Sequence, residues 1–217
     1  MENELLIDSV NISFGNKKIL TDIYLKIHTG DIIGLLGRNG CGKSTLLKII
    51  FGTLEAENKF IRANGRVYDK LYKQNEIINM LPQDDFLPKG FKVKHIAKLY
   101  KNINFEEFKL VQKIYNTKIE DLSGGEIRYF EFILLINSNA KFLLLDEPFN
   151  GVSPILADEI KIMIKNNSCN KGIIITDHDY RNVLSVANQI YIMKNGAIKK
   201  VNSEEELVNY GYIQSIC

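Results

Sequence analysis

The sequence predicts an α/β fold, with a mostly parallel sheet flanked by helices, an N-terminal antiparallel β subdomain and a short inserted α-helical subdomain. Three observations support this prediction. Short continuous apolar runs indicate strands buried on both faces of a parallel sheet. Residues 1–30 alternate between apolar and polar side chains, as in an antiparallel sheet with one exposed face. In the middle of the chain, apolar residues recur at helical spacing.

The N-terminal part predicts antiparallel strands followed by the first buried strand. The alternating segments LLIDSV, NISF and IYLKI are separated by turns at residues 15–16 and 29–30. The continuous apolar run IIGLLG at 32–37 then predicts a strand inside a parallel sheet. It leads into a glycine-rich turn and a helical pattern that ends at Gly52. This strand–turn–helix order is the setting in which a phosphate-binding loop is expected.

The C-terminal half predicts two more buried strands and a helix between them. The strands are FLLLD at 142–146 and GIIIT at 172–176. The segment between them begins a helical pattern at Pro154, a residue favoured in the first turn of a helix. Residues 191–198 predict a terminal hairpin with an Asn-Gly turn.

Residues 84–121 predict a small helical subdomain inserted into this core. Its apolar residues at helical spacing are Val93, Ile96, Ala97, Tyr100, Phe105, Phe108, Val111, Ile114 and Tyr115. The following helix is apolar nearly all round and is therefore expected to be buried. We expect one domain over 1–217, in which 1–83 and 122–217 form the core and 84–121 the insert.

The composition limits the class of protein. The chain has 217 residues and a net charge of +2, which gives no support for a nucleic-acid partner or a membrane-surface footprint. Its three cysteines show no metal-binding or disulfide spacing, as is typical of a reducing compartment. No signal peptide precedes the first strand, and no apolar run approaches the ~18–20 residues of a membrane helix. A cytoplasmic location is therefore expected.

The strongest motif is GRNGCGKST at 37–45, which matches the phosphate-loop pattern G-x-x-x-x-G-K-[ST]. Its glycines allow backbone N–H groups to point at phosphate oxygens, and the following helix adds partial positive charge. Lys43 supplies a cation for the β- and γ-phosphates, and the Ser44 hydroxyl can ligate Mg²⁺. The nucleotide-binding residues predicted here are Gly37, Arg38, Asn39, Gly40, Cys41, Gly42, Lys43, Ser44 and Thr45.

Two further motifs follow buried strands. Asp146 and Glu147 come at the end of FLLLD, where open α/β sheets place their ligands. We expect Asp146 to hold Mg²⁺ through water and Glu147 to polarise an attacking water molecule. His178 follows the next strand, so its imidazole can reach the same γ-phosphate.

The stretch LSGGE at 122–126 precedes the long apolar helix. Ser123 and Glu126 have the spacing of a capping box, in which each side chain bonds the other residue's backbone N–H. That reading explains the serine and the glutamate, but it does not explain why two glycines, which cost backbone entropy, stand together.

With the phosphate loop, LSGGE, FLLLDEP and TDH in this order, the chain resembles the nucleotide-binding subunits of ATP-binding cassette (ABC) transporters, which have a P-loop NTPase core. The resemblance covers essentially the whole chain, and it is loosely closest to lipopolysaccharide-export and branched-chain amino acid import ATPases. It implies ATP and Mg²⁺ as cofactors. It also implies a transmembrane permease as partner, peripheral association with the inner face of the membrane, and a homodimer or heterodimer of ATPase subunits.

The resemblance also implies roles for individual residues. Phe14 matches the aromatic residue that stacks on adenine. Gln83 matches the glutamine that contacts Mg²⁺ and the attacking water, Glu147 the general base, and His178 the γ-phosphate histidine. Ser123, Gly124 and Gly125 match a second phosphate-binding helix end, which serves the ATP held by the other chain of a head-to-tail dimer. The capping box is compatible with this role, because the capped terminus still offers N–H groups to an anion.

Three departures from the family pattern bear on the coupling between sites and on the permease partner. Ser153 stands where an aspartate is usual, Leu134 where an arginine is common, and the insert 84–121 is short. Two alternatives to a transport ATPase stay open at this point. One is a soluble ABC ATPase, for example of the cluster-assembly type, and the other is an ATP-gated scaffold with weak hydrolysis.

Overall fold

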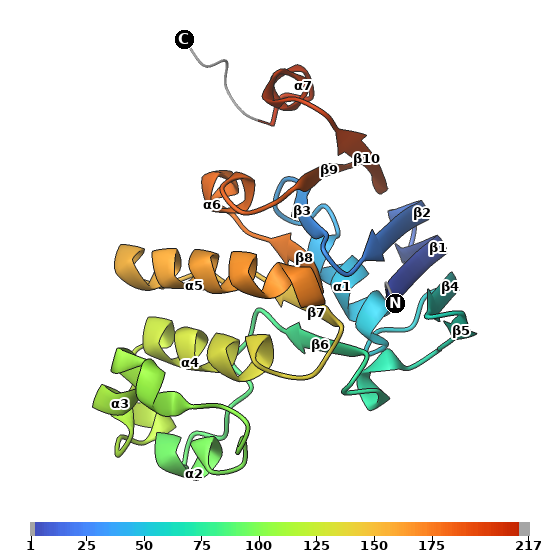
Figure 1. Ribbon diagram of the computed structural model, residues 1–217. Coiled ribbons are helices and arrows are strands. Elements are labelled where there is room, and N and C mark those ends of the chain that lie inside the picture. Colours follow the sequence, from blue (N-terminus) through green and yellow to red (C-terminus); the bar gives the residue numbers. More distant parts are fainter. Residues whose placement is uncertain (1–2, 213–217) are drawn as a thin grey trace.

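A computed structural model describes residues 3–212 of the chain (Figure 1). Two sheets and their helices form successive layers. Helix α1 (Lys43–Phe51) lies between the N-terminal antiparallel sheet and one face of the larger sheet, and helices from the second half of the chain cover the opposite face. The predicted fold class is confirmed.

The antiparallel sheet has the strand order β2-β1-β4-β5. Its strands are β1 (Glu4–Phe14), β2 (Lys17–His28), β4 (Asn58–Ala63) and β5 (Arg66–Val67). Alternate side chains of β2 from Ile23 to Ile27 are buried, because one face packs on α1 while the other meets water. The turn between β1 and β2 presents Phe14 and the following lysines beside the phosphate loop.

The larger sheet has the order β10-β9-β3-β8-β7-β6. Its strands are β3 (Ile32–Leu36), β6 (Ile78–Leu81), β7 (Phe142–Asp146), β8 (Gly172–Thr176), β9 (Gln189–Lys194) and β10 (Ala197–Val201). Only β10 runs antiparallel to its neighbour, across the predicted Asn195-Gly196 turn. All residues of β3, β7 and β8 are buried, which explains their continuous apolar sequences.

The helices of the second face are α4 (Gly124–Ile136), α5 (Pro154–Asn167), α6 (Tyr180–Leu184) and α7 (Glu204–Asn209). Helix α5 connects β7 to β8 as the predicted crossover, and Pro154 occupies its first turn. Helix α4 is buried nearly all round, because α5, the sheet and the helical segment pack on its different sides.

Residues 84–121 lie between β6 and α4 and pack against α4 (lower left of Figure 1). The segment contains α2 (Val93–Ala97), α3 (Lys109–Ile114) and short 3₁₀ turns. Its helices are shorter than the apolar spacing suggests, because Tyr100 and Phe105 lie in the connection between them. Both residues still pack against the core cluster that contains Val111 and Ile114.

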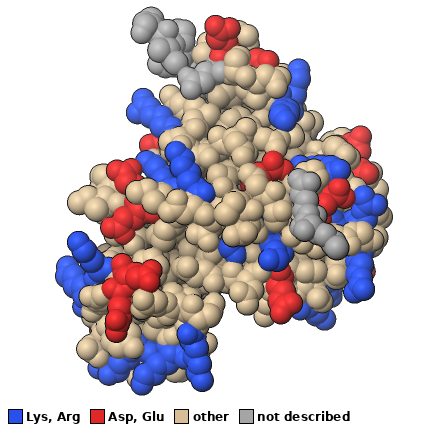
Figure 2. Space-filling view, in the orientation of Figure 1, with Lys and Arg blue, Asp and Glu red and all other residues tan. Residues whose placement is uncertain are grey.

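The carboxyl ends of the parallel strands bring the predicted motifs to one edge of the sheet. Asp146, the last residue of β7, pairs with Thr176, the last residue of β8. The phosphate loop follows β3, the next strand along. Within residues 3–212, no helix is both long and apolar enough to span a bilayer. Acidic and basic side chains are interspersed over the face shown in Figure 2.

Candidate functional site

The phosphate loop joins β3 to α1 in the predicted strand–turn–helix order. Gly42 directly precedes α1 with φ of 114°, in the left-handed region that favours glycine. A Cβ atom at Gly42 would also lie 2.9 Å from the Leu20 side chain. The loop backbone can therefore keep this path only with glycine at position 42.

Lys43 lies within the curl of this loop. Its side chain is buried, with 7% of the residue exposed, and Nζ donates a hydrogen bond to the Gly37 carbonyl at 2.8 Å. The ammonium group is thus held at the centre of the loop, where a lysine of this motif meets phosphate oxygens.

Asp146 lies across from the start of α1. Its Oδ1 accepts hydrogen bonds from the Ser44 hydroxyl at 3.1 Å and from the Thr176 hydroxyl at 2.6 Å. Its Oδ2 is buried and has no hydrogen-bond partner among the described residues. A hydroxyl and a free carboxylate oxygen beside a phosphate site suit Mg²⁺, which prefers oxygen ligands and retains waters and substrate phosphates. The residues present therefore fit this ion.

Glu147 and His178 form a close pair at the same edge. Nε2 of His178 lies 2.7 Å from Oε1 of Glu147, and the imidazole is half-exposed while the carboxylate is buried. Burial raises the pKa of the Glu147 carboxyl, and the charge of His178 opposes that rise. A carboxylate with a raised pKa is a better proton acceptor, as a general base requires.

These groups surround one cavity of about 480 Å³. Its lining brings together residues far apart in the sequence: Phe14, Ile19, Asn39, Gly40, Gly42, Lys43, Ser44, Thr45, Gln83, Glu147 and His178. Phe14 is 55% exposed, so one face of its ring is open for stacking. The predicted adenine, phosphate, metal and catalytic residues thus lie in or beside a single pocket.

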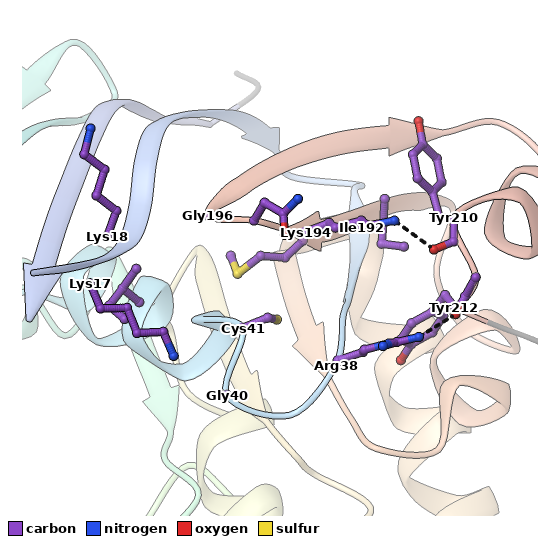
Figure 3. Close-up of a pocket in the computed structure, with 14 residues that line it drawn as sticks. Lys17, Lys18, Arg38, Gly40, Cys41, Ile192, Lys194, Gly196, Tyr210 and Tyr212 are labelled. Atoms are coloured by element: carbon purple, nitrogen blue, oxygen red, sulfur yellow. Dashed lines mark hydrogen bonds between the residues drawn. The ribbon is translucent and has the colours of Figure 1, made fainter.

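Arg38 and Cys41 lie on another side of the loop. They border a second cavity of about 550 Å³ between the β1–β2 turn, the β9–β10 turn and the end of α7 (Figure 3). Arg38 donates a hydrogen bond to the Gly211 carbonyl at 3.3 Å, and Lys194 donates one to the Tyr210 carbonyl at 3.2 Å. The segment after α7 therefore supports the outer side of the phosphate loop.

Ser123, Gly124 and Gly125 form the start of α4 and do not line the 480 Å³ pocket of their own chain. The predicted capping box is present, with Ser123 and Glu126 each accepting a hydrogen bond from the other's backbone N–H. A Cβ atom at Gly125 would lie 2.3 Å from the Gly151 carbonyl oxygen. At Gly124 it would meet nothing within 4 Å, so the fold itself does not require that glycine.

A family model described as ABC transporter matches residues 20–150. That stretch covers more than half of the chain and contains the phosphate loop, LSGGE, Asp146 and Glu147. The chain belongs to the ABC transporter family. The sequence-based resemblance is therefore confirmed.

Similar proteins agree with this assignment. An uncharacterised ABC transporter ATP-binding protein of Methanocaldococcus jannaschii is 30% identical, over 100% of this chain and 80% of its own length. The lipopolysaccharide export system ATP-binding protein LptB of Haemophilus influenzae is 30% identical, over 91% of this chain and 89% of its own length.

Solved structures show the same fold. A structure of an ATP-binding subunit of an ABC transporter superposes with a TM-score of 0.80 at 19% identity, covering 97% of this chain and 95% of its own. A nucleotide-free ATP-binding cassette from an ABC transporter gives a TM-score of 0.76 at 25% identity, covering 99% and 96%.

Sequence reasoning did not identify Ile19, which lines the pocket, or three residues that contact its surroundings. The Thr176 hydroxyl donates to the Asp146 carboxylate, and the buried Arg128 donates to the carbonyls of Asp146 and Glu147. The buried Glu131 accepts a hydrogen bond from the backbone N–H of Phe86. The available signal was the presence of an arginine and a glutamate in a helix that is otherwise apolar beyond its first turn. That signal shows that buried partners exist, but it does not say which ones.

Proposed function

We propose that this chain binds and hydrolyses ATP as the cytoplasmic ATPase subunit of a membrane transporter. Two such subunits, identical or related, pair head to tail, and their ATP-dependent closure drives a transmembrane permease. The observation on which this proposal rests is the single pocket that joins Phe14, the phosphate loop, Gln83, Glu147 and His178. Membership of the ABC transporter family supports ATP hydrolysis as the reaction.

In this proposal each residue has a defined task. Phe14 stacks on the adenine, and the loop N–H groups with Lys43 hold the triphosphate. Ser44, Asp146 and Gln83 would hold Mg²⁺, which would neutralise charge on the β- and γ-phosphates.

Hydrolysis then needs one attacking water molecule. Glu147 accepts a proton from it as its oxygen bonds to the γ-phosphorus, and the bond from that phosphorus to the β–γ bridging oxygen breaks. The products are ADP and phosphate. His178 orients Glu147 and contacts the γ-phosphate, so the pair places the base beside the transferred group.

The start of α4 supplies the second half of each site. Its capped terminus offers N–H groups to an anion, and Gly124 is exposed with open space around it. Close approach of another molecule's triphosphate explains a glycine that the chain's own packing does not require. Because this terminus does not line its own pocket, the nucleotide it binds belongs to the partner, and the dimer has twofold symmetry.

Glu147→Gln tests the ATP-driven pairing. The amide cannot accept the proton, so ATP persists and size-exclusion chromatography with ATP and Mg²⁺ should show a dimer. The same variant with Lys43→Ala is the control and should elute as a monomer. A monomer of Glu147→Gln at saturating ATP would contradict the proposal.

Mixed dimers test whether the two half-sites come from different chains. Ser123→Arg chains and Lys43→Ala chains should each be inactive alone, because every site of either homodimer lacks one half. Their mixture should regain up to about a quarter of wild-type activity, because half of the dimers are mixed and each has one intact site. A mixture without any regained activity, or with full activity, would refute the arrangement.

The link to transport is tested by purifying the tagged chain from its own cells in mild detergent. A polytopic membrane protein should copurify in stoichiometric amount, and Glu147→Gln should not disturb that association. Isolation of the ATPase alone would favour a soluble ABC ATPase.

A further inference from the structure

Helix α4 has two charged side chains in its buried interior, Arg128 and Glu131. Of these residues, 3% and 0% respectively are exposed to solvent. Their neighbours along the helix are apolar and fully packed. Burying a charge is costly unless it is matched by specific partners, so the contacts of these two residues show what they are for.

Among residues 3–212, the polar partners of Arg128 are backbone carbonyl groups and, at longer range, Glu131. Its Nη1 donates to the Pro82 carbonyl, and its Nη2 donates to the carbonyls of Asp146 and Glu147. Its Nε donates to the Glu147 carbonyl as well, at 3.2 Å. The planar guanidinium thus connects the residue before Gln83 with the strand end that bears the metal and base carboxylates.

The backbone of Glu147 needs such support. Its φ is 57°, a left-handed conformation that costs free energy for any residue except glycine and that persists only where the surroundings enforce it. Its N–H donates to the Thr176 carbonyl at 2.9 Å, and its own carbonyl accepts both bonds from Arg128. Arg128 therefore fixes the backbone at Glu147, and with it the direction in which the Glu147 side chain leaves the backbone.

Glu131 lies one helical turn further along. Its Oε1 accepts hydrogen bonds from the backbone N–H groups of Phe86 at 2.7 Å and Leu87 at 3.2 Å. Its Oε2 lies 3.8 Å from Nη1 of Arg128. Pro82 precedes Gln83 and Phe86 follows it, so the two charged residues hold the chain on both sides of Gln83.

We propose that Arg128 and Glu131 are positioning residues for ATP hydrolysis, which together fix Gln83 in place relative to Glu147. This inference rests on the proposed function, because it assigns the pair a task in that reaction. Both residues belong to α4, whose first turn binds the partner's nucleotide in the proposed dimer. A shift of α4 on dimerisation therefore moves the Gln83 segment with it, through backbone contacts and without touching the triphosphate.

Substitutions at Glu131 test the contacts to Phe86 and Leu87. Glu131→Gln keeps an oxygen acceptor, so its kcat at pH 8 should stay within about threefold of wild type. Glu131→Leu fills the space without an acceptor, so its kcat should fall at least about tenfold while the Kd for ATP changes less than about twofold. Phe132→Leu, a packing change on the same helix, is the matched control and should leave kcat within about threefold.

A double-mutant cycle shows whether the effect passes through Gln83. In a Gln83→Ala background, Glu131→Leu should lower kcat no further, because the group it positions is gone. Independent losses that multiply would overturn the proposal, as would a loss in Glu131→Gln equal to that in Glu131→Leu. Arg128→Lys retains the charge but not the planar guanidinium with its several donors, and its kcat should also fall at least about tenfold. Part of that loss should persist in the Gln83→Ala background, because Arg128 also supports the backbone of Glu147.

Hydrogen exchange gives a readout that does not depend on hydrolysis. The amides of Phe86 and Leu87 should exchange at least about tenfold faster in Glu131→Leu, and at the wild-type rate in Glu131→Gln and Phe132→Leu. Unchanged exchange in Glu131→Leu would overturn the positioning role of Glu131 even if hydrolysis fell. A wild-type chain that does not hydrolyse ATP would instead refute the proposed function, and the exchange result would still decide whether Glu131 holds the segment after Gln83.

Discussion

Nε2 of His178 lies 2.7 Å from Oε1 of Glu147, although the two residues come from the ends of different strands. The carboxylate is buried and the imidazole is half-exposed. This contact holds the carboxylate in one orientation at the cavity that also contains Lys43 and Gln83.

His178→Ala should therefore lower kcat by about 10- to 100-fold, because Glu147 loses the partner that orients it. The Kd for ATP should change less than about threefold, since the phosphate loop and Phe14 are untouched. Steady-state hydrolysis and nucleotide titration measure the two quantities. His95→Ala, an exposed histidine of α2, is the control. Equal loss in both variants would show that the contact with Glu147 has no catalytic role.

Phe14→Ala should weaken ATP binding by about 1–2 kcal/mol, because the exposed ring loses its stacking contact with adenine. Stability should hardly change, since the ring is 55% exposed in the folded chain. Phe60→Ala, on β4 of the same sheet but outside the pocket, is the matched control. Isothermal titration with ATP and with inorganic triphosphate separates the base from the phosphates. A Kd for ATP equal to that of wild type would remove Phe14 from the site.

Sequence reasoning reached the fold and much of the pocket for a specific physical reason. Strands such as β3 and β7 are buried on both faces, so their sequences are continuously apolar and end in the residues they deliver. The phosphate loop is a local motif, and its neighbours in sequence are its neighbours in space.

The buried pair on α4 behaves differently. Arg128 bonds Pro82, which lies 46 residues earlier in the chain, and Glu131 bonds Phe86, which lies 45 residues earlier. No periodicity encodes such partners, because they are set by how the segment after β6 packs on the helix. The contact of Arg38 with Gly211 escaped prediction for the same reason, since it depends on where α7 ends.

Stability should depend on pH through Glu131. Burial raises the pKa of its carboxyl from 4.5 to about 7 in the folded chain. As the pH rises from 4.5 to about 7, the unfolded chain loses this proton first, so the free energy of unfolding falls, and above that range it stays low. The expected loss is on the order of 3 kcal/mol at most.

Urea unfolding between pH 5 and pH 8 measures this slope. Glu131→Gln should remove it and should be more stable than wild type at pH 8, because no charge is buried. Glu76→Gln, a surface change, should leave the wild-type slope in place. If Glu131→Gln and wild type respond to pH in the same way, the carboxyl is not the group that titrates.

Gly124 and Gly125 should respond to alanine in opposite ways. Gly125→Ala places Cβ against the Gly151 carbonyl oxygen, so unfolding should become easier by about 1–3 kcal/mol. Gly124→Ala meets open space in the first turn of α4, and the better helix former should raise stability by about 0.5–1 kcal/mol.

In the Glu147→Gln background, however, Gly124→Ala should weaken the ATP-dependent dimer, because the new methyl group lies where the partner's triphosphate approaches. Chromatography with ATP and urea unfolding of the same samples separate the two effects. A more stable Gly124→Ala protein that still dimerises like its parent would show that nothing approaches this end of the helix, and the glycine would need another explanation.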